Sequence, residues 1–178
     1  IREPSNRFLK RLMDIAISIP IIILILPILY ILVLLIQVLA RSSGGVFYKQ
    51  TRLGRGAKEF EVLKFRTMNL GEYDESLQAT QKDPRIYPGG NLLRKLNVDE
   101  FPQFINVLRG EMSVVGPRPH LENHERQFED TYRKYGLRRL AKPGITGLAQ
   151  VTGLRGEVKK SEDILKRAQV DIKYIDTW

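Results

Sequence analysis

The stretch IAISIPIIILILPILYILVLLIQVL, residues 15–39, decides the fold, because it carries no charged side chain over 25 residues. An uncharged apolar run of this length is typical of a segment that inserts into a membrane. As a straight α-helix it would extend about 37 Å, which exceeds a hydrocarbon core of about 30 Å. A cleaved secretory signal is disfavoured, since the run is too long and no small-x-small cleavage site follows it. The simplest interpretation is a single transmembrane helix.

Two features favour instead a helix that enters and leaves the membrane on one side. Basic residues flank the stretch at both ends: Arg2, Arg7, Lys10 and Arg11 precede it, and Arg41, Lys49, Arg52, Arg55 and Lys58 follow it. The positive-inside rule therefore draws both ends to the cytoplasm. Pro27, near the middle, removes a backbone hydrogen bond and forces a bend. We predict a re-entrant helix broken at Pro27, with residues 1–44 as the membrane unit and 45–178 as a cytoplasmic domain.

Composition and charge narrow the class of protein. The chain has 178 residues, of which 43% are hydrophobic, so it can build a core and is not a disordered chain. Its net charge is +9; residues 1–58 hold nine Lys and Arg against two acids, whereas the remaining 120 residues hold twenty against eighteen. The positive charge thus surrounds the apolar stretch, which favours anionic lipid headgroups over nucleic acid as the partner. Cysteine is absent, which excludes disulfides, thiolate nucleophiles and cysteine-ligated metals and fits a reducing compartment.

The region after the apolar stretch predicts a small amount of β-structure. Residues 46–50 and 60–65 are rich in aromatic and branched side chains, which indicates a short hairpin lying on the membrane surface. Lys64 and Arg66, at its end, are either surface charges or contacts to a ligand. Residues 69–90 are polar and contain Pro and Gly turn signals, so we expect a surface loop there. The expected fold class is α+β, mainly helical.

Asp99 and Glu100 are two adjacent carboxylates in front of a helical pattern. The apolar residues at helical spacing are Phe101, Phe104, Ile105 and Leu108, and Gly110 ends the run. We therefore expect both carboxylates in the first turn of the helix, where free N–H groups and the helix dipole stabilise their ionised forms. An ionised Asp can attack phosphorus, and an ionised Glu can bind a hard cation. Acids also cap helices without any catalytic role, so that alternative stays open at this point.

Arg118 stands between Pro117 and Pro119. The two prolines fix the backbone, so the planar guanidinium would be held stiffly, as bidentate recognition of a phosphate requires. The alternative is an ordinary turn with a solvated arginine.

The C-terminal part of the chain is expected to be helical. His120 and His124 are four residues apart, but Leu121 stands where the zinc-hydrolase motif requires Glu, so a metal site there is disfavoured. Residues 120–140 are expected to form a charged helix, and residues 142–147 a loop. A last helix from Ser161 would bury Ile164, Leu165, Ala168, Ile172 and Ile175.

Several short strings occur in order along the chain: KFRTM at 64–68, DEFPQ at 99–103, NVLRGEMS at 106–113, VGPRP at 115–119, KPGITG at 142–147 and Asp171-x-x-Tyr174-x-x-x-Trp178. With these strings the chain closely resembles the bacterial sugar transferases, the monotopic polyprenyl-phosphate phosphoglycosyl transferases. The resemblance covers residues 10–178. Residues 153–157 are similar to the longer members, in which a further membrane and soluble region precedes this catalytic unit.

The resemblance implies a reaction, namely the transfer of a phosphosugar from a UDP-sugar to undecaprenyl phosphate with release of UMP. This would be the first membrane step in the synthesis of a surface glycan such as exopolysaccharide, capsule or O-antigen. It also implies a monotopic protein of the bacterial inner membrane, with membrane lipids as partners and the catalytic domain on the cytoplasmic face. Nucleic acid is not an expected partner, and a homo-oligomer is left open.

The resemblance also implies roles for single residues. In the family the Asp of the pair is the nucleophile, which corresponds to Asp99, and the Glu, here Glu100, binds Mg²⁺. The expected contacts to the substrate phosphates are Arg94, Arg118, Arg155, Lys64 and Arg66. Many members have Ser-Pro at the membrane break, whereas this chain has Leu26-Pro27 and lacks the hydroxyl that could bond to a freed carbonyl. The alternative from another class is a noncatalytic adaptor with a single-span anchor, in which Asp99 and Glu100 only cap a helix.

Overall fold

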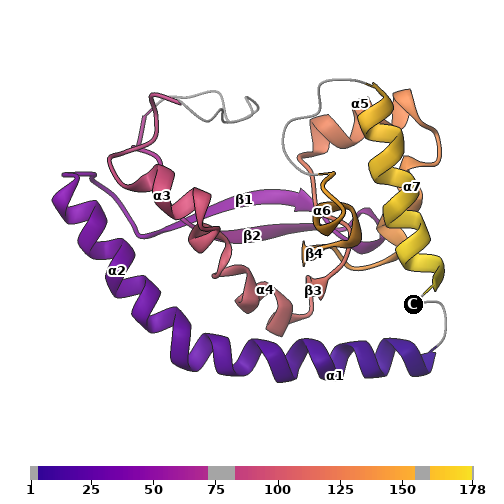
Figure 1. Ribbon diagram of the computed structural model, residues 1–178, viewed down its shortest axis with the longest axis horizontal. Helices are drawn as coiled ribbons and strands as arrows, with labels where there is room; N and C mark the ends of the chain where they lie inside the picture. The colour runs from indigo at the N-terminus through magenta and orange to yellow at the C-terminus, as the bar shows by residue number, and fades with distance from the viewer. Residues whose placement is uncertain (1–3, 72–82, 155–160, 178) are drawn as a thin grey trace.

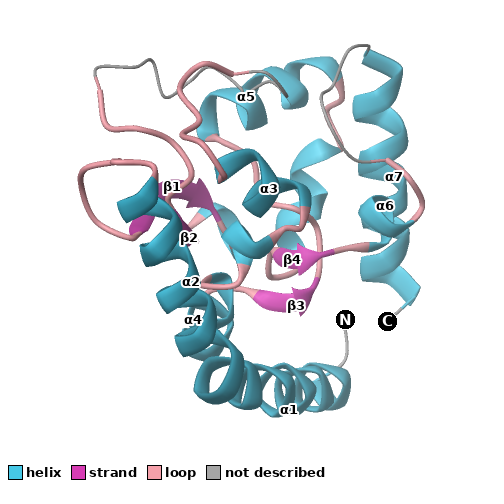
Figure 2. Ribbon diagram, turned by 60° about the vertical axis from the view of Figure 1, so that its left-hand side comes forward, coloured by secondary structure: helices cyan, strands magenta, loops and turns pink. Residues whose placement is uncertain are grey.

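The computed structural model describes residues 4–71, 83–154 and 161–177. Helices predominate, and the strands described form two small sheets of two strands each (Figure 1). The long N-terminal helical segment lies along one edge of the molecule, and the other elements lie on one side of it (Figure 1 and Figure 2). The expected mainly helical α+β fold with one long apolar helix and a small hairpin is therefore confirmed.

The apolar segment is broken close to Pro27. Helix α1 (Pro4–Pro20) and helix α2 (Leu26–Leu39) are joined by a π-helical turn, Ile21–Ile25, and Figure 1 shows the two helices meeting at an angle there. The N–H of Leu26 donates to the carbonyl of Ile21, five residues back, just before Pro27 interrupts the ladder. The wider π-helical turn thus accommodates the break, although this chain has Leu26 where many members of the family have a serine before the proline. The position of the bend is confirmed, whereas the re-entrant topology stays a prediction.

The segment Pro4–Leu39 is the one helix in the described residues that is long and apolar enough to cross a membrane. Only 11% of its most apolar window is buried against the rest of the protein, whereas the core helix of a soluble protein would be mostly buried. Its apolar face is therefore available to lipid.

Helix α1 turns its polar side chains inward and its apolar ones outward. Lys10 Nζ lies 2.8 Å from Asp14 Oδ1 and 2.5 Å from Ser113 Oγ, and all three residues are buried. On the opposite face Phe8 is 74% exposed and Leu12 is also exposed. A helix with an apolar outer face suits the boundary between lipid headgroups and acyl chains, while the inner face fastens it to the domain above.

Helix α2 shares a core with the residues that follow it. Leu26 and Val33 pack with Phe65, Tyr87 and Leu93 in one buried apolar cluster. Residues on both sides of the predicted 44/45 domain boundary therefore contribute to the same core.

The predicted hairpin is present and longer than expected. Strand β1 (Phe47–Leu53) pairs antiparallel with β2 (Glu59–Phe65), in a register that runs from Phe47 opposite Phe65 to Leu53 opposite Glu59. A 3₁₀ turn, η2 (Arg55–Ala57), connects them. Of the predicted surface loop, residues 72–82 lie outside the described residues, and Met68 forms an isolated antiparallel bridge with Ile86.

The two carboxylates lie in a different element from the one expected. Helix α3 (Gly90–Lys95) leads into a 3₁₀ turn, η3 (Val98–Glu100), and helix α4 begins only at Gln103 and ends at Arg109. Asp99 and Glu100 therefore precede α4 instead of forming its first turn, because Asn97, in the left-handed conformation, starts a separate turn. Gly110 ends α4 at φ +83°, as predicted.

The expected apolar face of α4 is wrong in part. Leu108 is exposed, and the buried positions are Gln103, Asn106 and Val107. Asn106 explains the difference, because its side chain accepts from Leu63 N at 2.9 Å and donates to Glu61 O at 2.7 Å. A buried amide thus joins α4 to β2.

Residues 142–147, predicted as a loop, contain a strand. Strand β3 (Ser113–Val115) pairs parallel with β4 (Gly144–Thr146), and a short helix, α6 (Leu148–Val151), follows. The close approach requires glycine on both sides, since a β-carbon on Gly144 would overlap the backbone of Gly116.

The C-terminal elements pack against this sheet. The predicted helix over 120–140 is two elements, α5 (Glu122–Thr131) and the 3₁₀ segment η4 (Tyr135–Leu140). Helix α7 (Ser161–Thr177) buries Ile164, Ala168, Asp171, Tyr174 and Ile175. Leu165, expected on the buried face, is exposed.

Candidate active site

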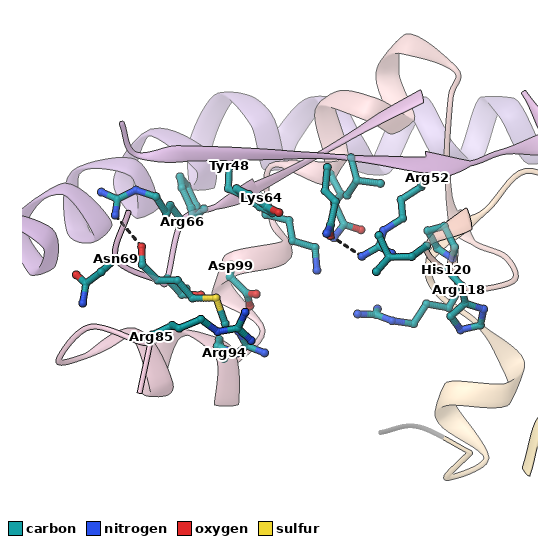
Figure 3. Close-up of a pocket in the computed structure, with 18 of the residues that line it drawn as sticks. Tyr48, Arg52, Lys64, Arg66, Asn69, Arg85, Arg94, Asp99, Arg118 and His120 are labelled. Carbon is teal, nitrogen blue, oxygen red and sulfur yellow. Dashed lines mark hydrogen bonds between the residues drawn. The ribbon is translucent and has the colours of Figure 1, made fainter. Parts of the chain in front are cut away.

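A cavity of about 380 Å³ opens between the hairpin, the η3 turn and the segment that carries Arg118. Asp99, Lys64, Arg94 and Arg118 all line it. In Figure 3, Asp99 and Lys64 lie between Arg94 and Arg85 on one side and Arg52 and Arg118 on the other. The structure therefore brings most of the predicted site residues to one place.

One face of the hairpin forms a wall of the cavity. Tyr48, Gln50 and Arg52 of β1 line it, as do Val62 and Lys64 of β2. Alternate residues of a strand point to the same face, and the register places Tyr48 opposite Lys64 and Gln50 opposite Val62. Tyr48, Gln50 and Arg52 were not among the predicted site residues, although the two-residue period of a strand places them on one face.

Asp99 lines the cavity, and within the described part of the chain its carboxylate has a hydrogen bond only from its own backbone. Among the described residues no other side chain forms a hydrogen bond or an ion pair with it. Burial raises the pKa of Asp99, and the nearby Glu100 raises it further, whereas Lys64 and Arg94 oppose the shift. Asp99 is thus a partly desolvated carboxylate with cations near it but none bonded to it, which suits a nucleophile.

Glu100, in contrast to Asp99, is bonded to two cationic side chains. Lys64 Nζ lies 3.1 Å from its Oε1, and the Arg118 guanidinium binds both oxygens, at 3.1 Å and 2.5 Å. Burial alone would raise the pKa of Glu100, but the two cations outweigh it and lower the pKa to about 2. Glu100 is therefore ionised at any pH at which the protein works.

Arg94 and Lys64 complete what we call the Asp99 cluster, namely Lys64, Arg94, Asp99, Glu100 and Arg118. Arg94 lies in the last turn of α3 and forms no ion pair within the described residues, so its guanidinium is available to a ligand. Burial lowers the pKa of Lys64, while Glu100 opposes that shift. Three cations and two carboxylates thus leave a net positive charge next to the cavity, which favours a phosphorylated ligand.

Two predicted phosphate contacts remain, Arg66 and Arg155. Arg66 lines the cavity but donates to Gly45 O, Ser42 Oγ and Met68 O, so most of its guanidinium fastens the end of α2 to the end of β2. Its Nη2 is buried and has no partner among the described residues. Arg155 lies outside the described residues.

The segment that carries Arg118 is held from three sides. The carbonyl of Pro117 accepts from Gly144 N at 2.9 Å, and Tyr174 Oη of α7 donates to Val115 O at 2.9 Å. Arg138 Nη2 donates to the carbonyl of Arg118 at 2.8 Å. The prolines therefore act together with long-range bonds in fixing the guanidinium, and those bonds were not visible in the sequence.

Arg138 is the centre of a second group of charges, the Arg138 cluster, which consists of His120, Glu125, Tyr135, Arg138 and Asp171. Its Nε lies 2.7 Å from Asp171 Oδ2, and its Nη1 lies 2.6 Å from Tyr135 Oη and 3.3 Å from Glu125 Oε1. All of these side chains are buried or nearly so. This cluster contacts the segment that carries Arg118 through Arg138 Nη2.

Comparison of the sequence with known families agrees with the geometry of the site. A family model described as bacterial sugar transferase matches residues 5–178, which is nearly the whole chain. The chain belongs to the bacterial sugar transferase family.

Relatives of this chain differ in the sugar that their names specify. A UDP-glucose:undecaprenyl-phosphate glucose-1-phosphate transferase of Escherichia coli K12 is 47% identical over 174 residues, which cover 97% of this chain and 37% of the relative. A protein of the same name from Caulobacter vibrioides is 41% identical over 170 residues, covering 95% and 63%. An N-acetylgalactosaminephosphotransferase that uses undecaprenyl phosphate, from Aeromonas hydrophila, is 36% identical over 177 residues, covering 99% and 41%.

The chain spans less than two thirds of the length of these relatives. They therefore share with it the unit that contains the Asp99 cluster, together with the helices α1 and α2.

The oxygen donors of the Asp99 cluster are compatible with Mg²⁺. The described residues hold no group of three or more His, Cys, Asp or Glu side chains arranged to bind a metal. Mg²⁺ is, however, commonly held by one or two carboxylates together with substrate phosphates and water. Ionised Glu100, with Asp99 beside it, supplies such oxygen ligands, although Lys64 and Arg118 occupy both Glu100 oxygens in this structure.

Proposed function

We propose that this chain transfers a sugar 1-phosphate from a UDP-sugar to undecaprenyl phosphate, with Asp99 as a covalent nucleophile and UMP as the first product. The observation that carries the proposal is the state of Asp99: a cavity-facing carboxylate with no bonded side chain, surrounded by Lys64, Arg94 and Arg118. The names of the relatives support the class of donor and acceptor.

In the first step an oxygen of Asp99 attacks the β-phosphorus of the UDP-sugar. The bond between that phosphorus and the bridging oxygen breaks, and UMP leaves with the electron pair. The transition state carries dense negative charge, which fixed cations stabilise more strongly in a partly buried site than in water. Arg118, whose backbone is held from three sides, and Arg94, which forms no ion pair in the described residues, are placed to do this.

In the second step an oxygen of the lipid phosphate attacks the same phosphorus, and the bond to Asp99 breaks, which restores the carboxylate. Displacements at phosphorus run in line, so UMP and the lipid phosphate occupy in turn the position opposite Asp99. The cavity end lined by Met68 and Leu70 is suited to the lipid, because Leu70 lies against Gly44, just after α2.

Glu100 is the residue that would hold Mg²⁺. When bound, the ion would neutralise charge on the diphosphate, which favours departure of UMP. Lys64 and Arg118 are bonded to the Glu100 oxygens here, so they would have to leave those oxygens for Glu100 to hold the ion.

The test is the release of UMP when the protein is incubated with each of several UDP-sugars, with and without undecaprenyl phosphate. The proposal predicts a stoichiometric burst without the lipid and continuous release with it, for at least one sugar. A noncatalytic adaptor would release no UMP under either condition. Release only when the lipid is present would contradict the covalent step.

We further propose that the bent helix is re-entrant, so that the protein lies on the cytoplasmic face of the bacterial inner membrane. The polar inner face of α1, its apolar outer face and the basic residues on both flanks support this placement. The chain has no cysteine, so single cysteines introduced at Ser5 and at Ser43 can be labelled without background. Both should label from the cytoplasmic side in inverted vesicles; labelling from opposite sides would instead indicate a spanning helix.

A further inference from the structure

His120 connects the Arg138 cluster to the cavity. It follows Arg118 by two residues and lines the same cavity (Figure 3). Its Nδ1 faces away from the cavity, at 2.6 Å from Tyr135 Oη and 3.2 Å from Arg138 Nη1. Glu125 Oε1 lies farther from it, at 3.4 Å. Phe128 packs edge-on against the ring, with centroids 5.5 Å apart, so the orientation of the imidazole is fixed.

The hydroxyl of Tyr135 determines which nitrogen of His120 carries the hydrogen. It accepts from Arg138 Nη1 at 2.6 Å, and a guanidinium can only donate. The one hydrogen of the hydroxyl therefore goes to its other partner in the described structure, Nδ1 of His120. Nδ1 is thus an acceptor, and the neutral ring carries its hydrogen on Nε2.

The ring is neutral at physiological pH. Burial lowers the pKa of His120 to about 4, and Arg138 and Arg118 act in the same direction, while Glu125 opposes them. Nε2 has no hydrogen-bond partner among the described residues. It is also not fully buried, unlike the Nη2 of Arg66. Because His120 lines the cavity and its Nδ1 is bonded within the Arg138 cluster, Nε2 is the N–H donor that this side chain can offer to a ligand there.

We propose that His120 is a substrate-binding residue whose Nε2–H donates a hydrogen bond to an oxygen of the nucleotide half of the donor, the half that leaves as UMP. This inference rests on the proposed function. A nucleotide offers phosphate, sugar and carbonyl oxygens as acceptors, and Arg118 on the same rigid segment provides the charge. A neutral N–H donor fixes the orientation of UMP through a hydrogen bond. It adds no further positive charge, so it does not hinder the release of UMP.

Two substitutions at His120 test the roles of the two ring nitrogens separately. In His120→Asn the amide reaches the position of Nδ1, so the bond from Tyr135 is kept and the donor toward the cavity is lost. In His120→Gln the longer side chain places an amide N–H near the position of Nε2, so the donor is kept and the inner bond is lost. Both proteins are compared with wild type by calorimetric titration with UMP in lipid nanodiscs, and by thermal unfolding.

The inference predicts that His120→Asn binds UMP about tenfold more weakly, with a melting temperature close to that of wild type. It predicts that His120→Gln binds UMP within about twofold of wild type, although it melts earlier. Equal UMP affinity of His120→Asn and wild type would overturn the inference and leave the proposed function intact. A wild-type protein that does not bind UMP would overturn both.

Tyr135 serves as a positioning residue, and its test is a double-mutant cycle. Tyr135→Phe removes the hydrogen that fixes the tautomer, so UMP binding should weaken about threefold in the wild-type background. In the His120→Asn background the same change should have no further effect on UMP binding, because the donor is already absent. Equal losses in the two backgrounds would show that Tyr135 acts through the fold and not through His120.

Discussion

The Asp99 cluster and the Arg138 cluster are built from the same kinds of side chain but are bonded differently. Around Arg138 each carboxylate accepts from a cation inside the protein, with Nε 2.7 Å from Asp171 and Nη1 3.3 Å from Glu125. Around Asp99 the charges are only partly paired, because Arg94 and Asp99 bond to no side chain of the described residues. Buried charges that are fully paired hold a fold together, whereas charges left unpaired beside a cavity are available for chemistry.

The largest effect is expected at the unpaired carboxylate. Asp99→Asn removes the nucleophile, so the rate of UMP release should fall by about a thousandfold or more. The matched control is Asp130→Asn, on the exposed face of α5, which should leave the rate unchanged. A rate near that of wild type for Asp99→Asn would place the chemistry elsewhere.

Loss of a cation from the Arg138 cluster should lower the stability of the protein. Arg138→Met leaves Asp171 and Glu125 buried without their cation, so the free energy of unfolding should fall by about 3 kcal/mol. The side chains of Arg138 and Asp171 are only 4% and 3% exposed, so solvent cannot take the place of the missing partner. Denaturant unfolding of the full chain in nanodiscs measures this, and an unchanged midpoint would mean that the cluster is not structural.

The electrostatics of Asp99 predict a pH effect. The pKa of Asp99 is raised chiefly by burial, and Lys64 opposes that shift. The carboxylate must be ionised to attack, so UMP release should decline with falling pH at a midpoint above the usual Asp value. Lys64→Met removes the opposing charge and should move this acid limb to higher pH. A limb that stays in place, or moves to lower pH, would contradict the role given to Lys64.

The smallest effect is expected at an exposed pair with similar geometry. Lys49 Nζ lies 3.0 Å from Glu61 Oε2, but the two side chains are 60% and 59% exposed. Lys49→Ala should change the free energy of unfolding by less than about 1 kcal/mol, because water screens the pair. The same unfolding assay thus distinguishes the effect of burying an ion pair from the effect of a short distance between its two charges.

The sequence predicted the elements that local patterns determine. The uncharged run with Pro27 at its centre indicated a broken apolar helix, and the structure has a π-helical turn at residues 21–25. Aromatic and branched residues predicted the hairpin, and Gly110 ends α4 as expected. The strings around Asp99 and Arg118 indicated residues that the fold brings to one cavity.

The sequence did not predict what depends on distant partners. Strands β3 and β4 have only three residues each, too few to show a period, and they pair because Gly116 and Gly144 allow close contact. The helix that was expected to start with Asp99 begins later, because Asn97 adopts a positive φ. Nothing in the local pattern indicated a structural role for Asn106 or Arg138, yet each joins segments far apart in the chain.

One measurement tests the central claim most directly. The protein is incubated with UDP-sugar and no lipid, digested, and the peptide that contains Asp99 is weighed and fragmented. The account predicts a phosphosugar adduct on Asp99 in amounts matching the UMP released, which disappears when undecaprenyl phosphate is added. UMP release with no adduct on Asp99, or with the adduct on another residue, would contradict it.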